Sequence, residues 1–208
     1  MKDQGQCGSC WAFSTTGSLE GAHFVAEREL ESFSEQQLVD CARGSYSNHG
    51  CKGGNPLWAF KYLKSNEAER ETSYPYTSGT TMVHGTCAQD VEEDIHVNVL
   101  TYGAVTPNNV AQMKAALATQ PISVLVEADT SVFQTYKSGV LDSSACGTQL
   151  DHAVLAVGWG TEDGKDYWLV KNSWNTTWGD QGYIKLAITG DDAGICGVQS
   201  GPSYATSN

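Results

Sequence analysis

The run Gln4-Gly5-Gln6-Cys7-Gly8-Ser9-Cys10-Trp11-Ala12-Phe13-Ser14 places two residues between its cysteines and a glycine two positions before each cysteine. Glycine permits tight backbone geometry where a side chain would clash. A cysteine in the first turn of a helix lies beside unpaired N–H groups and the positive end of the helix dipole, which favour the thiolate. The run therefore predicts a loop that delivers Cys10 to a helix N-terminus as an activated nucleophile. Two alternatives stay open at this point: both cysteines form disulfides, or the pair is a redox Cys-x-x-Cys site.

The composition restricts the classes of function. The 208 residues suffice for one large domain or two small ones with a substantial core. A net charge of -12 argues against nucleic acid as a partner, because phosphates attract patches of Lys and Arg. The chain contains no apolar run of about 18 residues, which argues against a membrane span, and no charged-then-apolar leader follows Met1.

The cysteine count is high and odd. The seven cysteines are Cys7, Cys10, Cys41, Cys51, Cys87, Cys146 and Cys196. Three disulfides and one reactive thiol are the simplest arrangement, and they predict an oxidising or lysosomal compartment. The alternatives are a reduced cytosolic protein with buried thiols and, with less support, a structural zinc site. Because there is one Cys-x-x-Cys and no histidine spaced to complete four ligands, we expect neither a metal nor a cofactor.

Hydrophobic periodicity predicts helices in the first half and strands in the second. The predicted helices cover residues 11–28, 34–41 with a capping box at Ser34, the segment capped by Asn55 with Pro56 at its first position, and 109–119. We expect the third helix to bury Trp58, Tyr62 and Leu63, and the fourth to present Val110, Met113 and Leu117 on one side. The predicted strands cover residues 122–126, 152–158, 166–174 and 182–188, and irregular segments cover 42–54 and 67–94, the latter pinned by Cys87.

This segregation predicts an α+β fold of two lobes. Residues 1–104 would form a helical lobe that carries the nucleophile, and residues 105–208 a β-rich lobe. A cleft between two such lobes is the default position for a site.

A cysteine nucleophile needs a base, and the base needs an orienting partner. His152 is the best candidate among five histidines, because it opens the apolar strand Leu150-Asp151-His152-Ala153-Val154. His23 lies on the same predicted helix as Cys10, roughly 20 Å along its axis and out of reach. The remaining three, His49, His84 and His96, lie in glycine-rich or polar stretches where we expect them to be solvated.

An amide that could hold this imidazole follows another predicted strand, in the run Lys171-Asn172-Ser173-Trp174. The neutral Asn172 can orient an imidazolium that is paired with a thiolate, and Trp174 can shield that hydrogen bond from water. Each residue alone has a plainer explanation, because a tryptophan usually belongs to a core and a histidine can simply end a strand.

Taken together, these motifs resemble the papain family of cysteine proteases, in particular its cathepsin L-like members. Cys-Gly-Ser-Cys-Trp is the local signature of the papain and cathepsin nucleophile, with histidine and asparagine far downstream. His152 lies 142 residues after Cys10, and Asn172 lies 162 residues after it. The resemblance runs from Lys2 to about Gly197 and includes the loop Gly50-Cys51-Lys52-Gly53-Gly54 and the pair Trp178-Gly179.

The resemblance implies a papain-like fold, with a helical N-terminal lobe, an antiparallel β-barrel-like C-terminal lobe and the active-site cleft between them. It implies that Cys10 is the nucleophile, His152 its base and Asn172 the residue that orients His152. The amide of Gln4 and the Cys10 N–H would form the oxyanion hole, and Trp174 would cover the group. The implied disulfides are Cys7–Cys51, Cys41–Cys87 and Cys146–Cys196, which leave Cys10 as the thiol.

The resemblance also implies a site for an extended peptide. Gly53 and Gly54 would pair with the substrate backbone. Asp151 and Trp174 are further residues expected to contact the substrate. The pocket for the second residue before the scissile bond matches Asn55, Pro56, Leu125, Leu150, Ala153 and, at its floor, Gly201. Since no acidic side chain stands there to pair with arginine, we expect a preference for bulky apolar side chains.

Two positions depart from the family's pattern. Lys52 stands where the family usually carries Asn, and Asn175 stands where it carries Gly, although Asn tolerates a positive φ. Asn175-Thr176-Thr177 is also the only N-glycosylation sequon of the chain. Glu20, Glu35 and Lys171 match family positions where charges meet between the lobes.

Three functions compete. The first is a lysosomal, vacuolar or secreted endopeptidase that acts on peptides and proteins as a monomer, with a propeptide or cystatin-type proteins as inhibitors. The second is a thiol–disulfide oxidoreductase that uses Cys7 and Cys10, which would leave His152 and Asn172 without purpose. The third is a catalytically silent binding protein on the same fold.

Overall fold

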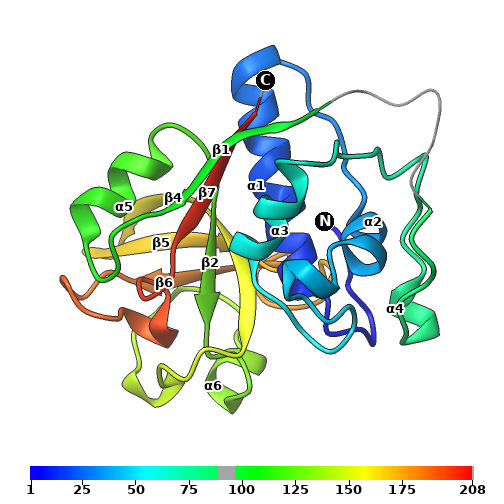
Figure 1. Cartoon of the computed structure of the whole chain (residues 1–208). Helices are drawn as coiled ribbons and strands as arrows, with labels where there is room; N and C mark the ends of the chain where they lie inside the picture. The colour runs from blue at the N-terminus through cyan, green and yellow to red at the C-terminus, as the bar shows by residue number, and fades with distance from the viewer. Residues whose placement is uncertain (89–96, 208) are drawn as a thin grey trace. The chain divides into compact units, whose positions relative to one another are not determined.

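The computed structural model describes residues 1–88 and 97–207 and divides the chain into two compact units. One comprises Met1–Lys2 and Ala104–Ser203, and we call it the sheet unit; the other comprises Asp3–Gly103 and Tyr204–Asn208, and we call it the helical unit. The helices of the first half and the strands of the second half lie in different units (Figure 1), which confirms the predicted α+β class. No helix in the described ranges is long and apolar enough to span a bilayer.

The helical unit is built around one long helix. Its elements are α1 (Cys10–Glu27), α2 (Glu35–Cys41), η1 (Gly44–Tyr46), α3 (Pro56–Leu63) and α4 (Ser78–Thr81), and most of β1 (Val99–Ala104) lies in it. Trp11, Ala12 and Leu19 of α1 are fully buried, and α1 packs against both α2 and α3. The helix that carries Cys10 is therefore the core of its unit, which holds its N-terminus in place.

Side chains cap the next two helices as the sequence predicts. The Ser34 hydroxyl accepts a hydrogen bond from the Gln37 N–H at 2.9 Å, and the Asn55 side chain accepts one from the Leu57 N–H at 2.9 Å. The capping box of α2 is only half formed, because the Gln37 side-chain oxygen accepts from the Glu69 N–H at 3.0 Å and the Ser34 N–H donates to the Glu69 carbonyl at 2.9 Å. The Gln37 side-chain nitrogen donates to the Glu67 carbonyl at 2.7 Å. That bond ties α2 to the segment that follows α3.

The predicted burial of Trp58 is wrong, because 42% of this residue is exposed. The buried stripe of α3 runs through Pro56, Ala59, Phe60 and Leu63, at helical spacings of three and four residues. Trp58 points away from the centre of that stripe. Tyr62 and Leu63 are buried as expected.

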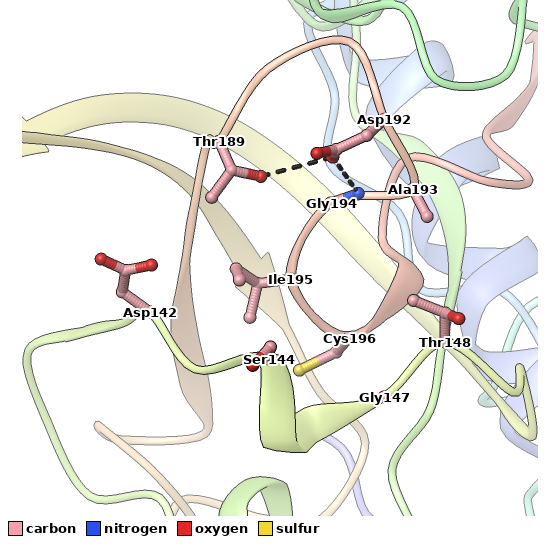
Figure 2. A pocket seen from close by; sticks show the side chains of 10 residues that line it. All are labelled: Asp142, Ser144, Gly147, Thr148, Thr189, Asp192, Ala193, Gly194, Ile195 and Cys196. Carbon is pink, nitrogen blue, oxygen red and sulfur yellow. Dashed lines mark hydrogen bonds between the residues drawn. The ribbon is translucent and has the colours of Figure 1, made fainter.

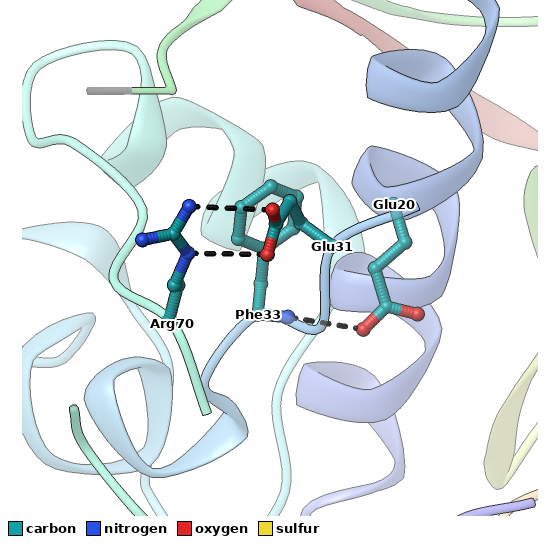
Figure 3. A network of polar contacts seen from close by, with 4 residues as sticks. All are labelled: Glu20, Glu31, Phe33 and Arg70. Carbon is teal, nitrogen blue, oxygen red and sulfur yellow. Dashed lines mark hydrogen bonds and ion pairs between the residues drawn. The ribbon is translucent and has the colours of Figure 1, made fainter. Parts of the chain in front are cut away.

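Ionic and backbone contacts hold the segment after α1 against residues 67–71 (Figure 3). Arg70 binds both carboxylate oxygens of Glu31, at 3.1 and 3.2 Å, and Phe33 forms an isolated bridge with Arg70. Glu20 of α1 accepts a hydrogen bond from the Phe33 N–H at 3.1 Å. The segment predicted as loops thus contains β-bridges and the short helix α4. The end of that predicted segment, from residue 89, lies outside the described residues.

In the sheet unit the strands follow the order β7-β2-β4-β5-β6-β3. They are β2 (Ile122–Val126), β3 (Val140–Leu141), β4 (His152–Glu162), β5 (Lys165–Lys171), β6 (Tyr183–Ala187) and the first residue of β7 (Ser203–Ser207), accompanied by α5 (Val110–Leu117), α6 (Ser131–Gln134), η2 (Ser144–Cys146) and η3 (Ile195–Gly197). The core of the sheet consists of apolar side chains with no exposure, among them Val124, Ala156, Trp168 and Ile184. Four strands match the predicted ones, with β4 four residues longer.

The expectation of an antiparallel barrel-like sheet is corrected by the structure. β3 pairs in parallel with β6, so the sheet is mixed, and the strand order across the described part of the chain does not close into a barrel. β4 and β5 intervene between β3 and β6, and such a crossover permits a parallel pair that a hairpin forbids. The sequence also missed β1, β3 and β7, which are short or polar and carry no clear alternation.

Three disulfides form, and they are the pairs that the resemblance implies. Cys7–Cys51 and Cys41–Cys87 lie in the helical unit, and Cys146–Cys196 lies in the sheet unit. All seven cysteines fall within the described residues, and Cys10 is the one that keeps its thiol.

Candidate active site

Cys10 is the first residue of α1, and Ser9 is the N-cap of that helix. The half-buried thiol therefore lies where the first N–H groups of an 18-residue helix and its dipole favour a negative charge. The Ser9 side chain makes no capping bond to the helix. Its hydroxyl lies 2.7 Å from the hydroxyl of Tyr76 instead.

The loop before Cys10 is anchored by its backbone. The Gly8 N–H donates to the Cys51 carbonyl at 2.9 Å beside the Cys7–Cys51 disulfide, and the Gln6 N–H donates to the Gly79 carbonyl at 2.9 Å. Gly5 has a φ of 58°, and a side chain there would collide with the backbone of Gly79. A glycine is required at this position on both counts.

Gln4, at the start of this loop, is 9% exposed. Its side-chain amide donates to the Cys7 carbonyl at 3.0 Å, and its own carbonyl accepts a hydrogen bond from the Tyr76 hydroxyl at 2.8 Å. Because a primary amide nitrogen carries two hydrogens, the same group can serve a second acceptor. Burial raises the pKa of Tyr76 to about 12, so this hydroxyl is protonated and able to donate at any ordinary pH.

The glycine-rich loop lies against the indole of Trp11, the residue after Cys10. A Cβ at Gly54 would lie 2.8 Å from Cδ2 of that indole and would also collide with the Asn48 side chain. Gly53 has a φ of 103°, and the Trp11 Nε1–H donates to the Gly50 carbonyl at 3.1 Å. The backbone at Gly53 and Gly54 is thus held in place within the helical unit.

The start of α3 continues this arrangement. The Asn48 side chain accepts a hydrogen bond from the Asn55 N–H at 2.8 Å. Asn55 is half-buried, and Pro56 is buried.

In the sheet unit, strand register brings His152 and Asn172 together. β4 and β5 are antiparallel with Leu155 opposite Lys171, so Asn172 falls opposite Val154 and diagonal to His152 on the same face. The His152 Nε2 and Asn172 Oδ1 lie 2.8 Å apart, and both residues are buried, at 7% and 3% exposure.

The hydrogen bonds of Asn172 determine which ring nitrogen of His152 carries a hydrogen. The Ser173 backbone N–H donates to the same Asn172 Oδ1 at 2.8 Å, which identifies this atom as the amide oxygen. An oxygen acceptor requires that His152 Nε2 carry a hydrogen. Nδ1 is therefore the ring nitrogen that exchanges a proton in any acid–base step.

Aromatic rings cover this pair. Trp174 lies tilted over His152 with ring centroids 4.8 Å apart, and Trp178 meets Trp174 edge-on at 5.4 Å. Phe133 of α6 stacks on Trp178 at 5.1 Å and approaches His152 edge-on at 6.4 Å. Such rings exclude water and strengthen the bond between imidazole and amide.

In the sheet unit, three of the positions predicted for the substrate pocket lie close together. Leu125 and Ala153 are paired residues of β2 and β4, and a Cβ at Gly201 would lie 3.0 Å from Leu125 Cδ1. Leu150 is exposed. The Asp151 carboxylate accepts hydrogen bonds from the N–H groups of Ala128 at 2.7 Å and Asp129 at 3.2 Å, so it holds the turn after β2.

The other histidines have different surroundings. His23 is buried in α1 with its ring 5.8 Å from that of Phe33, whereas His49 and His84 are exposed as expected. His96 lies outside the described residues. Glu20 and Glu35 bind the Phe33 N–H and the Thr16 hydroxyl of their own unit.

A separate pocket of about 580 Å³ lies beside the Cys146–Cys196 disulfide (Figure 2). Apart from Cys196, its lining shares no residue with the predicted site; the lining residues are Asp142, Ser144, Gly147, Thr148, Thr189, Asp192, Ala193, Gly194, Ile195 and Cys196. Its two carboxylates are engaged within the unit, Asp142 with Lys165 at 2.8 Å and Asp192 with the Gly194 N–H at 2.8 Å. Both carboxylates of this pocket therefore hold its own walls together.

Comparison with known proteins identifies the family. A family model described as "Papain family cysteine protease" matches residues 1–206. The chain belongs to the papain family of cysteine proteases.

The chain is similar to proteins that are named as cysteine proteinases or as cathepsin L. The chain is 46% identical to the Arabidopsis thaliana protein "Cysteine proteinase RD21A" over 210 residues, which are 100% of this chain and 44% of that protein. It is 46% identical to "Cathepsin L" of Sarcophaga peregrina over 217 residues, 99% of this chain and 60% of that protein. The chain thus spans about half the length of these papain-family relatives.

A solved structure of the family shares the fold. The cysteine protease CMS1MS2 of Carica candamarcensis, crystallised in complex with E-64, superposes with a TM-score of 0.90 at 38% identity, covering 99% of this chain and 92% of that one. The papain-like fold expected from the sequence is confirmed by this similarity.

Sequence reasoning missed several residues that support the site. They are Ser9 and Tyr76 around Gln4, Asn48 beside Gly54, and Phe133 beside His152. No local pattern marks Tyr76, which lies 72 residues from Gln4 and 67 from Ser9.

Proposed function

We propose that the chain is a cysteine endopeptidase in which Cys10 is the nucleophile and His152 the base. The observation that carries the proposal is the buried bond between His152 Nε2 and Asn172 Oδ1, at 2.8 Å, in a chain whose remaining thiol starts a helix. Asn172 holds the imidazole in the tautomer that leaves Nδ1 for proton transfer. Membership of the papain family supports the same assignment.

The reaction has two stages. The Cys10 thiolate attacks the scissile carbonyl carbon, a C–S bond forms, and the carbonyl oxygen takes the negative charge. The Gln4 amide and the Cys10 N–H donate to that oxygen, His152 Nδ1 gives its proton to the leaving amine, and the C–N bond breaks. In the second stage neutral His152 takes a proton from water and the resulting hydroxide attacks the thioester carbonyl carbon. The C–S bond then breaks, the acid product leaves, and the Cys10 thiolate and His152 imidazolium are restored.

The substrate is an extended peptide. Its backbone pairs with Gly53 and Gly54, and its second residue before the cut enters the pocket of Leu125, Ala153, Gly201, Leu150, Asn55 and Pro56. The pairing of Leu125 with Ala153, and the absence of a side chain at Gly201 beside Leu125, support a bulky apolar side chain there. Since the Asp151 carboxylate is held by the turn after β2, this residue contributes through its backbone. Trp174 lies over His152 and covers it.

The oxidoreductase alternative is not favoured, because Cys7 is bonded to Cys51 and not to Cys10. The binding-protein alternative would need the buried His152–Asn172 pair to serve no purpose. Neither reading accounts for the aromatic cover of that pair.

For the whole protein we propose two lobes, 1–104 and 105–208, protein and peptide substrates, and a propeptide or cystatin-type inhibitors. We also propose that it acts as a monomer in a lysosomal, vacuolar or secreted setting. The three disulfides support an oxidising compartment. Relatives named as cathepsin L and as digestive cysteine proteinases support the setting.

Asn175 completes the proposal as a glycosylation site. It is exposed with Thr176 and Thr177, and its φ of 62° shows that it occupies the left-handed turn where the family has glycine. Expression in a eukaryotic secretory host should yield a glycan on peptide 175 that Thr177→Ala removes and Thr177→Ser retains. An unmodified wild-type peptide would refute the site.

The catalytic proposal is tested by titration with a thiol-directed epoxide and a fluorogenic peptide. We expect one label per chain, on Cys10, with hydrolysis lost in proportion, and no label on Cys10→Ala. A folded chain that labels at Cys10 without any hydrolysis would support the binding protein. A thiol at Cys7 in place of the Cys7–Cys51 bridge would support the oxidoreductase.

A further inference from the structure

The Tyr76 hydroxyl bridges the two ends of the loop that precedes Cys10. It donates to the Gln4 carbonyl at 2.8 Å, and it lies 2.7 Å from the hydroxyl of Ser9. Ser9 is fully buried and directly precedes the nucleophile, whereas Gln4 starts the loop. One hydroxyl group thus contacts both ends of the loop, and these ends are Gln4, one proposed oxyanion donor, and Ser9, the residue before the other proposed donor, the Cys10 N–H.

The direction of these bonds can be assigned. A carbonyl only accepts, so the Tyr76 hydrogen points to Gln4, and the Ser9 hydroxyl must donate to the Tyr76 oxygen. The other acceptor near Ser9 Oγ, the Cys7 carbonyl, is farther away at 3.4 Å. The order is therefore Ser9 to Tyr76 to Gln4, a chain in which each bond polarises the next.

Tyr76 is itself held on several sides. Its N–H donates to Glu71 Oε1 at 2.9 Å, and its ring meets Phe13 of α1 edge-on at 4.9 Å. The next residues, Thr77 and Ser78, donate their N–H groups to the Gln36 side chain at 2.8 and 2.9 Å. The hydroxyl therefore reaches the loop from a rigid support within the helical unit.

We propose that Tyr76 is a positioning residue for the oxyanion hole, fixing the backbone of Gln4 relative to Ser9 and Cys10. The inference rests on the proposed function, because it requires Gln4 to donate to the oxyanion. Tyr76 touches neither the substrate nor the thiol in this role. It acts by restricting the rotation of the residue whose side chain supplies the donor.

The kinetic effect of losing the hydroxyl follows from when the oxyanion exists. The negative charge develops in the transition state, so a displaced donor lowers kcat and leaves KM nearly unchanged. Tyr76→Phe removes both neutral hydrogen bonds of this hydroxyl, to Gln4 and from Ser9, and we expect a fall in kcat of about 3- to 10-fold. Removing the donor itself, in Gln4→Ala, should cost roughly 100- to 1,000-fold.

Tyr74→Phe is the matched control. Tyr74 lies two residues away, and burial raises its pKa to about 12 as well, but its hydroxyl donates to Asp40 Oδ2 at 2.8 Å and lies near the Thr86 carbonyl. A general loosening of the segment would affect kcat equally in both variants. A role in positioning Gln4 predicts that kcat falls more in Tyr76→Phe than in Tyr74→Phe.

The test is a double-mutant cycle on kcat and KM with Tyr76→Phe, Gln4→Ala and their combination, each checked for its melting temperature. We expect the cost of Tyr76→Phe to disappear in the Gln4→Ala background, while the small effect of Tyr74→Phe persists in both. An equal cost of Tyr76→Phe in both backgrounds, or a change confined to KM, would overturn the inference. A folded Gln4→Ala variant with full activity would instead refute the proposed role of Gln4, so the two failures are distinguishable.

Discussion

At the scale of single residues, Asn172 determines which nitrogen of His152 can react. Its Oδ1 accepts from both the Ser173 N–H and His152 Nε2, each at 2.8 Å, in surroundings where water is excluded. A buried imidazole without this acceptor would lose both its orientation and its preferred tautomer. In the proposed mechanism this residue would therefore direct proton transfer without touching the substrate.

Asn172→Ala should lower kcat/KM about 10- to 100-fold, the equivalent of one hydrogen bond to a charged group. Steady-state kinetics between pH 4 and about 8 covers the ordinary range of a histidine. Unchanged kinetics in a folded variant would contradict the assigned role.

Gly201 lies beside Leu125 and is the proposed floor of a substrate pocket for which the sequence offers no acidic side chain. The atoms nearest to a Cβ there all belong to the flexible Leu125 side chain, with Cδ1 at 3.0 Å and Cγ at 3.4 Å, so a small shift of Leu125 makes room. Gly201→Glu should therefore fold and place a carboxylate at the floor of the pocket. We expect the ratio of kcat/KM for Arg over Leu, at the second position before the cut, to rise by about tenfold or more.

The control for this change is Gly201→Gln, which has the same size and no charge. Equal ratios for the Glu and Gln variants would show that space and not charge determines the preference. Faster cleavage after Arg than after Leu by the wild-type chain would show that the pocket is assigned wrongly.

At the scale of elements, the start of α1 depends on the glycine loop packed beside it. Gly54 lies against the Trp11 indole and the Asn48 side chain, and Asn48 in turn accepts the N–H of Asn55, the N-cap of α3. Two helix starts and the loop between them therefore form one packed group. The closed contact also explains why a residue larger than glycine is excluded.

Gly54→Ala should destabilise the protein by about 1–3 kcal/mol, since overpacking displaces a buried ring. Gly158→Ala is the control, because nothing lies within 4 Å of a Cβ there. Differential scanning calorimetry should show a lower melting temperature for the first variant only. Equal melting temperatures for the two variants would contradict the packing argument.

At the scale of the whole molecule, two half-buried tyrosines, Tyr74 and Tyr76, link stability to alkaline pH. Burial raises the pKa of Tyr74 and of Tyr76 from 10.0 to about 12, with Asp40 contributing to the first. Between these pH values the folded state holds protons that the unfolded chain has released. The associated stabilisation is fully present below pH 10 and is lost as the pH rises toward 12.

Stability against denaturant should therefore fall steeply above pH 10. The combined variant Tyr74→Phe and Tyr76→Phe should show a shallower decline there, although its stability at pH 7 is lower. Urea unfolding at several pH values between about 8 and 12 measures this slope. An identical slope in the variant would show that other groups cause the alkaline loss.

Much of the architecture follows from local patterns. Ser34 and Asn55 cap the helices that the sequence predicts, four strands lie where apolar runs predict them, and Cys10 starts a helix. Such features depend on neighbours within about one turn or one strand, which is the range over which side-chain spacing acts. The exposure of Trp58 on α3 was not predicted, because the burial of a helix residue depends on which segments pack against that side of the helix.

The sequence by itself determined the class of the fold, the nucleophile loop, and the strand ends that carry His152 and Asn172. Only the tertiary structure decided that the sheet is mixed and open, that Phe133 supports the cover of His152, and that Tyr76 binds both Gln4 and Ser9. The physical reason is separation along the chain. Hydrogen bonds between residues some 70 positions apart form only when packing brings two segments together. The periodicity within either segment does not predict which other segment will pack against it.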